Sequence, residues 1–276
     1  MTDLPEPVDW TDAFDNSSYV PGSEALAGLW SEMAATWRAA MERQGKARLD
    51  LEYGSGPRER FDLFLPETEA RGLVVFLHGG YWQWMDKSAF SHLAAGPRRR
   101  GWAVAMPSYP QAPEVRISAI TKSVASAIGA AAADVTGPIR IAGHSAGGHL
   151  AARMACADSA LPAPVAARIE RVMSISGVHD LRPLLHSAMN ETLKLDAAEA
   201  EAESPALLKP RTGLSIHAVV GAAERPELMR QTRLLAEAWH HAGADVADAY
   251  LAGEDHFSIV EAFADPESGL VTRLLD

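Results

Sequence analysis

The sequence contains a single cysteine, Cys156, among its 276 residues. One cysteine cannot form an internal disulfide, so a disulfide-stabilised secreted scaffold is excluded. The chain therefore fits a cytosolic setting, and we expect a cytoplasmic protein. Cys156 lies about two turns beyond a motif described below, where we expect a buried helix residue rather than a reactive thiol.

Long apolar runs and excess positive charge are also missing. No apolar stretch approaches the roughly 18 residues of a membrane span, and residues 1–15 are acidic and lack the apolar core of a signal peptide. The formal net charge is −11, which argues against binding nucleic acid or anionic membranes, since both need clustered Lys and Arg. We expect the partner to be a small-molecule substrate.

The chain does contain a regular alternation of short apolar runs and longer helical patterns. Short apolar runs indicate strands buried on both faces, as in a parallel sheet. The predicted strands of this kind are residues 73–77, 102–106, 139–142, 172–175 and 216–220, and residues 246–251 are the predicted last strand. Helical patterns lie between them at residues 87–100, 118–133, 146–157 and 226–242. This alternation predicts an α/β fold: a doubly wound, mostly parallel sheet with helices on both faces.

Three further segments complete the predicted organisation. Residues 60–65 alternate in polarity, which predicts an antiparallel edge strand, and residues 24–42 form an amphipathic helical pattern outside the sheet. Residues 177–213 lack a strand pattern and predict short helices that form a small cap. We therefore expect a single domain over 1–276, with an N-terminal helical extension of about 1–48 and a cap-like insertion of about 177–213.

The most informative motif is Gly143-His144-Ser145-Ala146-Gly147, which reads G-x-S-x-G. It follows a predicted strand and opens a predicted helix. In that context the pattern indicates a nucleophile elbow, a tight turn that exposes the serine hydroxyl above the sheet. The two glycines allow backbone segments to approach closely around a strained serine. Ser145 is therefore the predicted nucleophile.

A serine nucleophile needs a base, because its hydroxyl is weakly nucleophilic at neutral pH. His256 follows the last predicted strand, where this arrangement carries its histidine; the alternative is a helix-capping role. The other nine histidines show no metal-ligand spacing, so we expect no metal and no cofactor. They are His78, His92, His144, His149, His179, His186, His217, His240 and His241.

The acid that orients the histidine should follow the strand at 216–220. Glu224 is the first carboxylate beyond that strand, and it is the predicted acid. Glu227 lies one turn into the next helix, where it would favour the helix dipole. Asp180 and Asp255 are the other competitors.

An oxyanion hole is predicted from His78-Gly79-Gly80, directly after the strand at 73–77. Glycines let backbone N–H groups approach a developing oxyanion without an intervening side chain. The N–H groups of Gly79, Gly80 and Ala146, the residue after the nucleophile, are the predicted donors.

Aromatic side chains cluster beside this loop, and the predicted substrate-binding residues are Tyr81, Trp82, Trp84 and Tyr109. All four follow the ends of predicted strands, where open α/β sheets bind ligands. They favour a planar aromatic substrate; the alternative is that the loops pack on one another.

Taken together, these motifs resemble the α/β-hydrolase superfamily and, more narrowly, the arylformamidase (kynurenine formamidase) family of serine hydrolases. The resemblance covers nearly the whole chain. Its matching stretches are 78–83 (H-G-G-Y-W-Q), 108–117, 143–150, 176–184, 224–231 and 255–261, with Asp15-Asn16 and Val20-Pro21-Gly22 near the start.

The resemblance implies hydrolysis of an aryl formamide such as N-formylkynurenine to the aryl amine and formate. It implies Ser145 as nucleophile, Glu224 as acid and His256 as base, and it makes a homodimer an expectation. Glu224 departs from the Asp that such enzymes commonly carry. A carboxylesterase acting on small acyl esters, and a non-catalytic binding protein with a hydrolase fold, are the alternatives.

Overall fold

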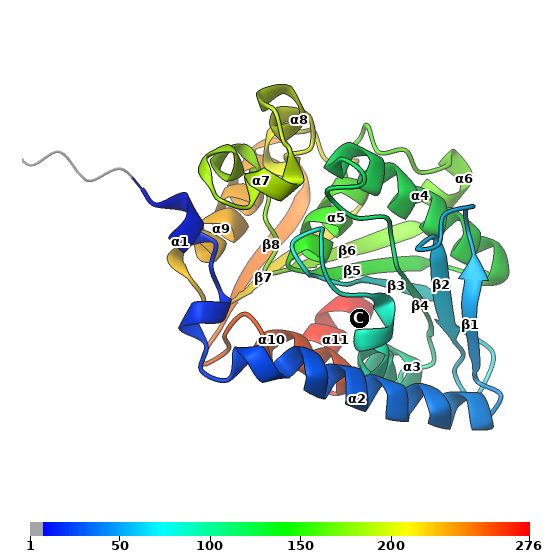
Figure 1. Cartoon of the computed structure of the whole chain (residues 1–276). Helices are drawn as coiled ribbons and strands as arrows, with labels where there is room; N and C mark the ends of the chain where they lie inside the picture. Colours follow the sequence, from blue (N-terminus) through cyan, green and yellow to red (C-terminus); the bar gives the residue numbers. More distant parts are fainter. Residues whose placement is uncertain (1–7) are drawn as a thin grey trace, which may run out of the picture.

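The computed structural model describes residues 8–276, and it is built around one twisted eight-stranded sheet (Figure 1). The strand order is β1-β2-β4-β3-β5-β6-β7-β8. The strands are β1 Ala47–Glu52, β2 Arg60–Phe64, β3 Leu73–Leu77, β4 Ala103–Pro107, β5 Ile139–His144, β6 Ile169–Ile175, β7 Ser215–Gly221 and β8 Asp245–Leu251. Every predicted strand is present. Residues 1–7, part of the predicted N-terminal extension, lie outside the described residues.

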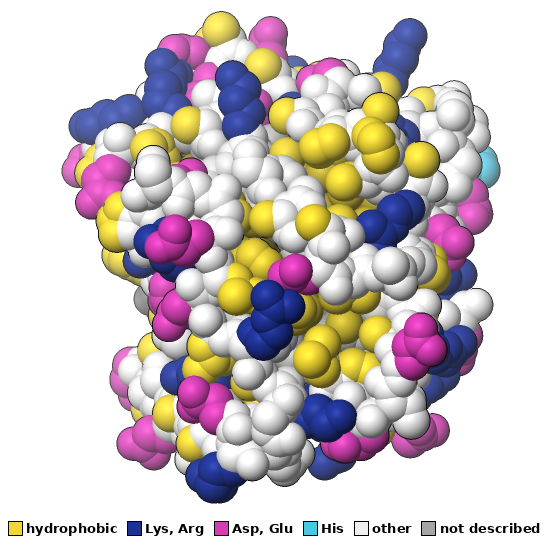
Figure 2. Space-filling model, turned by 90° about the vertical axis from the view of Figure 1, so that its right-hand side faces the viewer, with side chains coloured by type: hydrophobic (Ala, Val, Ile, Leu, Met, Phe, Trp, Pro, Cys, Tyr) yellow, Lys and Arg dark blue, Asp and Glu magenta, His cyan; other side chains and the backbone are white. Residues whose placement is uncertain are grey.

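β3 to β8 run parallel, whereas β2 pairs antiparallel with both β1 and β4. The prediction of an antiparallel strand at 60–65 is confirmed, but its place at the edge is wrong. β1 occupies that edge, and it alternates half-buried apolar residues with exposed charged ones, including Arg48, Asp50 and Glu52. Figure 2 views this side of the molecule and shows charges of both signs scattered over it. Charges discourage pairing with another sheet edge.

Helices cover both faces of the sheet (Figure 1). One face packs against α4, α5 and α9, and the other packs against α3, α11 and the long α2. The α-helices are α1 Trp10–Ala13, α2 Ser23–Arg43, α3 Ala95–Arg99, α4 Ile117–Asp134, α5 Ala146–Met154, α6 Ala163–Ala166, α7 Asn190–Leu193, α8 Ala197–Ala202, α9 Pro226–His241, α10 Ser258–Glu261 and α11 Gly269–Leu275. The predicted doubly wound α/β fold is therefore correct.

Residues 87–100 and 177–213 both consist of short helical pieces. The predicted helix at 87–100 is instead broken into 3₁₀ turns at Lys87–Ala89 and Ser91–Ala94, followed by α3. Asp86 accepts a hydrogen bond from Ser88 N and begins the first turn, and Phe90 interrupts the helical backbone with φ −116° and ψ 2°. Residues 177–213 hold only short helices, including α7 and α8, as predicted for the cap.

Candidate active site

Ser145 lies on the sharp turn between β5 and α5, with φ 56° and ψ −121°. This backbone is strained by about 1–3 kcal/mol for a non-glycine residue. Close packing holds it: a Cβ on Gly143 would lie 2.0 Å from the Gly147 carbonyl oxygen, and one on Gly147 would lie 2.0 Å from the Leu77 carbonyl oxygen. Only glycine fits at either position, so the G-x-S-x-G spacing follows from steric contact.

Ser145, His256 and Glu224 converge at the carboxyl ends of the parallel strands. His256 Nε2 lies 3.1 Å from Ser145 Oγ, and His256 Nδ1 lies 2.8 Å from Glu224 Oε2. Because a carboxylate only accepts, Nδ1 carries the proton and Nε2 is free to accept the serine proton. The hydroxyl, the imidazole and the carboxylate therefore form one continuous hydrogen-bonded chain.

The other oxygen of Glu224 is fully engaged. Oε1 accepts from the Ser176 hydroxyl and, at 2.8 Å, from the Gly221 N–H. Burial alone would raise the pKa of this carboxyl, but the neighbouring His256 ring and these donors together hold its pKa below the usual value. Glu224 is thus a buried carboxylate that is charged and aimed at the imidazole.

The three competing carboxylates do not contact His256. Glu227 pairs with Arg230 and Gln231 on its own helix. Asp180 pairs with the neighbouring Arg182, and Asp255 accepts from the backbone N–H groups of the two residues that follow His256. Of the four candidate acids, only Glu224 reaches the histidine.

His144, the variable residue of the elbow motif, holds the histidine loop in place. Its Nε2 donates to the His256 carbonyl oxygen at 2.7 Å, and the two rings lie 4.8 Å apart. Burial lowers the pKa of His144 to about 3, so the ring stays neutral. Sequence reasoning gave His144 no metal-ligand role and did not predict this contact.

The predicted oxyanion loop runs directly over the elbow. A Cβ on Gly79 would lie 3.1 Å from Ser145 Cβ, and a Cβ on Gly80 would lie 2.2 Å from the Trp84 carbonyl oxygen. Gly80, Tyr81 and Trp82 have φ values of 110°, 52° and 59°. Positive φ at two successive non-glycine residues requires strong support from outside the loop.

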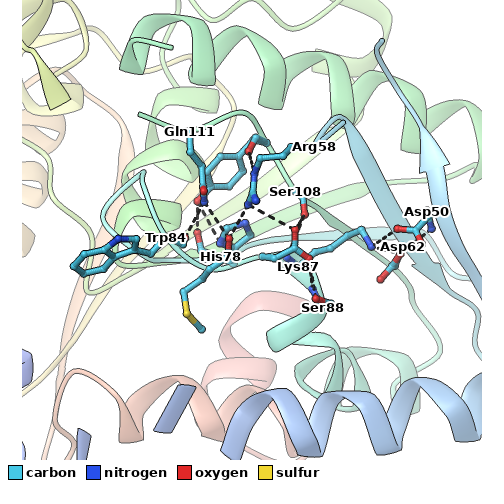
Figure 3. A network of polar contacts seen from close by, with 12 residues as sticks. Asp50, Arg58, Asp62, His78, Trp84, Lys87, Ser88, Ser108 and Gln111 are labelled. Atoms are coloured by element: carbon cyan, nitrogen blue, oxygen red, sulfur yellow. Dashed lines mark hydrogen bonds and ion pairs between the residues drawn. The ribbon is translucent and has the colours of Figure 1, made fainter. Parts of the chain in front are cut away.

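Figure 3 shows part of that support. Gln111 Nε2 donates to the carbonyl oxygens of Trp84 and Met85 at 2.8 and 3.1 Å. Arg58 donates to the Met85 carbonyl oxygen at 2.7 Å and to that of Tyr109 at 3.0 Å. Two side chains from outside the loop therefore fix its C-terminal half.

The four predicted aromatic residues divide into two pairs. Tyr81 and Trp84 line the cleft beside Ser145. Trp82 is buried and donates from Nε1 to His149 Nδ1 at 3.1 Å, which anchors the loop to α5, and it also lines a small space beside Ser145 and Ala146. Tyr109 is fully buried, stacks on His78 at 4.4 Å and donates to its carbonyl oxygen. Tyr109 is therefore not brought to the cleft, because its hydroxyl and ring are both used in supporting the loop.

Two spaces of very different size flank Ser145. The cleft has a volume of about 170 Å³ and is lined by Ser145, His256 and residues of α2, including Leu26 and Trp30. Among the residues described, none that lines it is Lys, Arg, Asp or Glu. On the other side, a pocket of about 10 Å³ is enclosed by Ser145, Ala146 and mainly apolar side chains. We call these the cleft and the small pocket.

The family model of the alpha/beta hydrolase family matches residues 74–274. The chain belongs to the alpha/beta hydrolase family. This hydrolase is also similar to kynurenine formamidases: it is 32% identical to that of Danio rerio over 82% of this chain and 80% of the relative, and 29% identical to that of Drosophila melanogaster over 86% and 83%. It is therefore an arylformamidase-like enzyme of the serine hydrolase type.

Solved structures of other proteins share the fold of this chain. A crystal structure from Silicibacter sp. TM1040 that carries the name "putative thioesterase" is 47% identical, with a TM-score of 0.91 over 98% of this chain and 100% of that one. An esterase from Pyrobaculum calidifontis is 17% identical, with a TM-score of 0.68 over 90% and 91%. The second likeness shows the fold alone.

Sequence reasoning missed two groups of residues in this hydrolase. Ser176, which donates to Glu224, directly follows β6, and its position at a strand end was the available signal. The α2 residues Leu26 and Trp30 carried no signal, because an amphipathic helix does not reveal which surface it covers.

In residues 8–276 no group of three or more His, Cys, Asp or Glu side chains has the arrangement of a metal site. None of the helices in that range has the length and apolar character needed to cross a membrane.

Proposed function

We propose that this hydrolase cleaves an aryl formamide, such as N-formylkynurenine, to the aryl amine and formate. The observation that carries the proposal is the contact chain from Ser145 Oγ through His256 to Glu224, set between a very small pocket and a much larger cleft. The likeness to kynurenine formamidases supports the same substrate class.

In the first half of the reaction, Ser145 Oγ attacks the formyl carbon and its proton passes to His256 Nε2. The carbonyl electron pair moves to the oxygen, which the N–H groups of Gly79, Gly80 and Ala146 stabilise. His256 then gives its proton to the amide nitrogen, the C–N bond breaks, and the aryl amine leaves. The charged Glu224 stabilises the imidazolium that exists between these two proton transfers.

In the second half, a water molecule gives one proton to His256 and attacks the formyl ester. The bond between the formyl carbon and Ser145 Oγ breaks, and the proton on His256 returns to the serine. Formate is released and the resting hydroxyl is restored. Every proton taken up by His256 is thus returned within one cycle.

The two spaces suit the two sides of a formamide carbonyl. The formyl carbon carries only hydrogen on one side, which the small pocket of about 10 Å³ accommodates. The aryl leaving group occupies the cleft of about 170 Å³, beside Tyr81 and Trp84. Because the lining described for the cleft carries no charged residue, the uncharged ring binds there and any charged substituent extends to the mouth.

Aniline release from a series of anilides that differ only in acyl size tests this proposal. Formanilide should be hydrolysed with a much larger kcat/KM than acetanilide or butyranilide. Labelling by a fluorophosphonate probe should occur in the native enzyme and be abolished in Ser145→Ala. A protein that never labels would instead support a non-catalytic binding role, and a preference for butyranilide would contradict the small formyl pocket.

Hydrolysis of a small ester or thioester is the second candidate. The observation that favours it is the 47% identity to the structure named "putative thioesterase". Formyl and acetyl thioesters tested beside formanilide distinguish the two, since a thioester preference of several orders of magnitude would favour the second candidate.

We also propose a cytoplasmic location and a homodimeric state, with a small molecule as the binding partner. Fractionation of the native cells and sedimentation of the purified chain would test the first two. A secreted protein, or a strictly monomeric one at micromolar concentration, would contradict them.

A further inference from the structure

Asn16 lies beside the reacting centre without an assigned task. It precedes the 3₁₀ turn Ser17–Tyr19 and is only 3% exposed. Although it occupies the position of a helix cap, its side chain makes no capping hydrogen bond. The residue is therefore buried for a reason other than capping the turn.

The amide oxygen of Asn16, Oδ1, is a hydrogen-bond acceptor, since an amide donates only from its nitrogen. Oδ1 is buried and has no hydrogen-bond partner among the described residues. A buried unpaired acceptor destabilises a fold, so its retention needs an explanation.

The position of Asn16 supplies that explanation. Its side chain lines the small pocket together with Ser145 and Ala146. It also lines a second space of about 210 Å³, together with Glu224 and His256. Asn16 thus borders the nucleophile on one side and the acid and base on the other.

A formamide carries an N–H donor on the atom that leaves, beside Ser145 and His256, and an ester has no such donor. When the tetrahedral intermediate collapses, the nitrogen lone pair must face His256 Nε2 to receive its proton. The N–H bond then points away from His256 and needs an acceptor once it has left water. The corresponding atom of an ester is an oxygen without hydrogen, and it would leave Asn16 Oδ1 unpaired.

We propose that Asn16 Oδ1 accepts the N–H of the scissile formamide and so selects amides over esters. This inference rests on the proposed function and names the bond that the site prefers. It makes Asn16 a specificity-determining residue that acts on the reacting nitrogen itself.

Asn16→Leu tests the protein side, since leucine has a similar size and no acceptor. The ratio of kcat/KM for formanilide to kcat/KM for phenyl formate should fall about 10-fold to 100-fold, as expected for the loss of one transition-state hydrogen bond. Ser18→Ala is the matched control, because Ser18 is exposed in the same turn and should leave the ratio unchanged. An equal loss on both substrates in Asn16→Leu would show a structural role and overturn the inference.

The substrate side is tested by removing the N–H. The native enzyme should prefer formanilide to N-methylformanilide, and Asn16→Leu should reduce this preference about 10-fold to 100-fold, since the acceptor is gone. Asn16→Asp keeps an acceptor oxygen and should keep the preference; it carries the test if the leucine variant does not fold. Loss of the preference in Asn16→Asp, or its survival in Asn16→Leu, would overturn the inference alone. A native enzyme that does not hydrolyse formanilide would overturn the proposed function as well.

Discussion

The proposed reacting centre and the wall of the cleft are built in different ways. Ser145, Glu224 and His256 all lie just beyond the ends of parallel strands, and each is fixed by hydrogen bonds to the backbone or to one another. The wall comes from the N-terminal segment, in which α2 and the turn before it lie across one side of the sheet (Figure 1), together with Tyr81 and Trp84. The centre is set by the topology, whereas the wall is added to it.

This difference means that the centre carries out the reaction, whereas the wall determines which substrate is preferred. Strand ends meet at one edge of any parallel sheet, so the same centre recurs wherever the fold does. A segment outside the sheet is free to change without disturbing that centre. We therefore expect substitutions in the centre to change kcat and substitutions in the wall to change substrate preference or KM.

The largest effect is expected for Ser145→Ala. Without the nucleophile no formyl enzyme forms, and kcat should fall on the order of 10⁴-fold or more. The thermal unfolding temperature should change little, because the substitution removes only the hydroxyl and its hydrogen bond to His256 and leaves the contacts of the core unchanged. Steady-state turnover of formanilide together with calorimetry checks both statements. Substantial residual turnover would place the nucleophile elsewhere.

Glu224→Gln should lower kcat by about 10³-fold to 10⁴-fold. Glutamine keeps the size of the side chain but removes the charge that stabilises the imidazolium. Glu227→Gln is the matched control, since Glu227 pairs only with Arg230 and Gln231 and should retain kcat. If Glu227→Gln or Asp255→Asn loses turnover while Glu224→Gln keeps it, the acid has been misassigned.

Trp82→Phe should lower kcat about 10-fold with little change in KM. The substitution removes the bond to His149 that holds the positive-φ loop carrying the proposed oxyanion donors. Trp239→Phe is the matched control: Trp239 is equally buried and donates to two carbonyl oxygens, but it lies on α9. A similar loss of kcat in both variants would indicate general loss of packing.

Trp84→Ala should raise KM several-fold and leave kcat nearly unchanged. Trp84 is 61% exposed and lines the mouth of the cleft, so it contributes contact area and no contact with the reacting atoms. Saturation kinetics with formanilide measure the two constants. A fall in kcat alone would mean that the wall and the centre are not separable at this position.

The smallest effect concerns stability in acid. Burial would raise the pKa of Asp86, but hydrogen bonds from Ser88 and Ser108 outweigh it and hold the pKa at about 2, below the usual 3.8. The stabilisation is therefore present above pH 3.8 and is lost as the pH falls toward 2. Asp86→Asn should remove about 1 kcal/mol at neutral pH, a value reduced for a side chain that is 39% exposed. Urea unfolding of both proteins at pH 7 and pH 2.5 measures it, and a difference that grows in acid would contradict the assignment.

The sequence predicted the centre better than the wall for a physical reason. Gly143 and Gly147 are imposed by contacts of about 2 Å, and the loops after β7 and β8 present few candidate side chains, so short motifs locate Ser145, Glu224 and His256. Tyr109 was grouped with Tyr81, Trp82 and Trp84 because an aromatic at a strand end can face either the site or the loop, and Tyr109 alone of the four lines neither space beside Ser145. Asn16 was noted only within a stretch that resembles the family, and its place beside Ser145 was not predicted, since that place depends on how a segment more than 100 residues away folds back.

The same reasoning explains the errors in the fold. The strand at 60–65 was placed at the edge because β1 has an exposed charge at every second position and lacks a continuous apolar run. The helix at 87–100 was predicted as continuous because periodicity does not register the turn begun by Asp86.

The most direct test of the central claim is kcat/KM for N-formylkynurenine measured beside that for p-nitrophenyl acetate on one preparation. We predict that N-formylkynurenine is hydrolysed at least as efficiently, although its amide is intrinsically the less reactive bond. A preference for the ester by several orders of magnitude would contradict the assignment of this site to formamides.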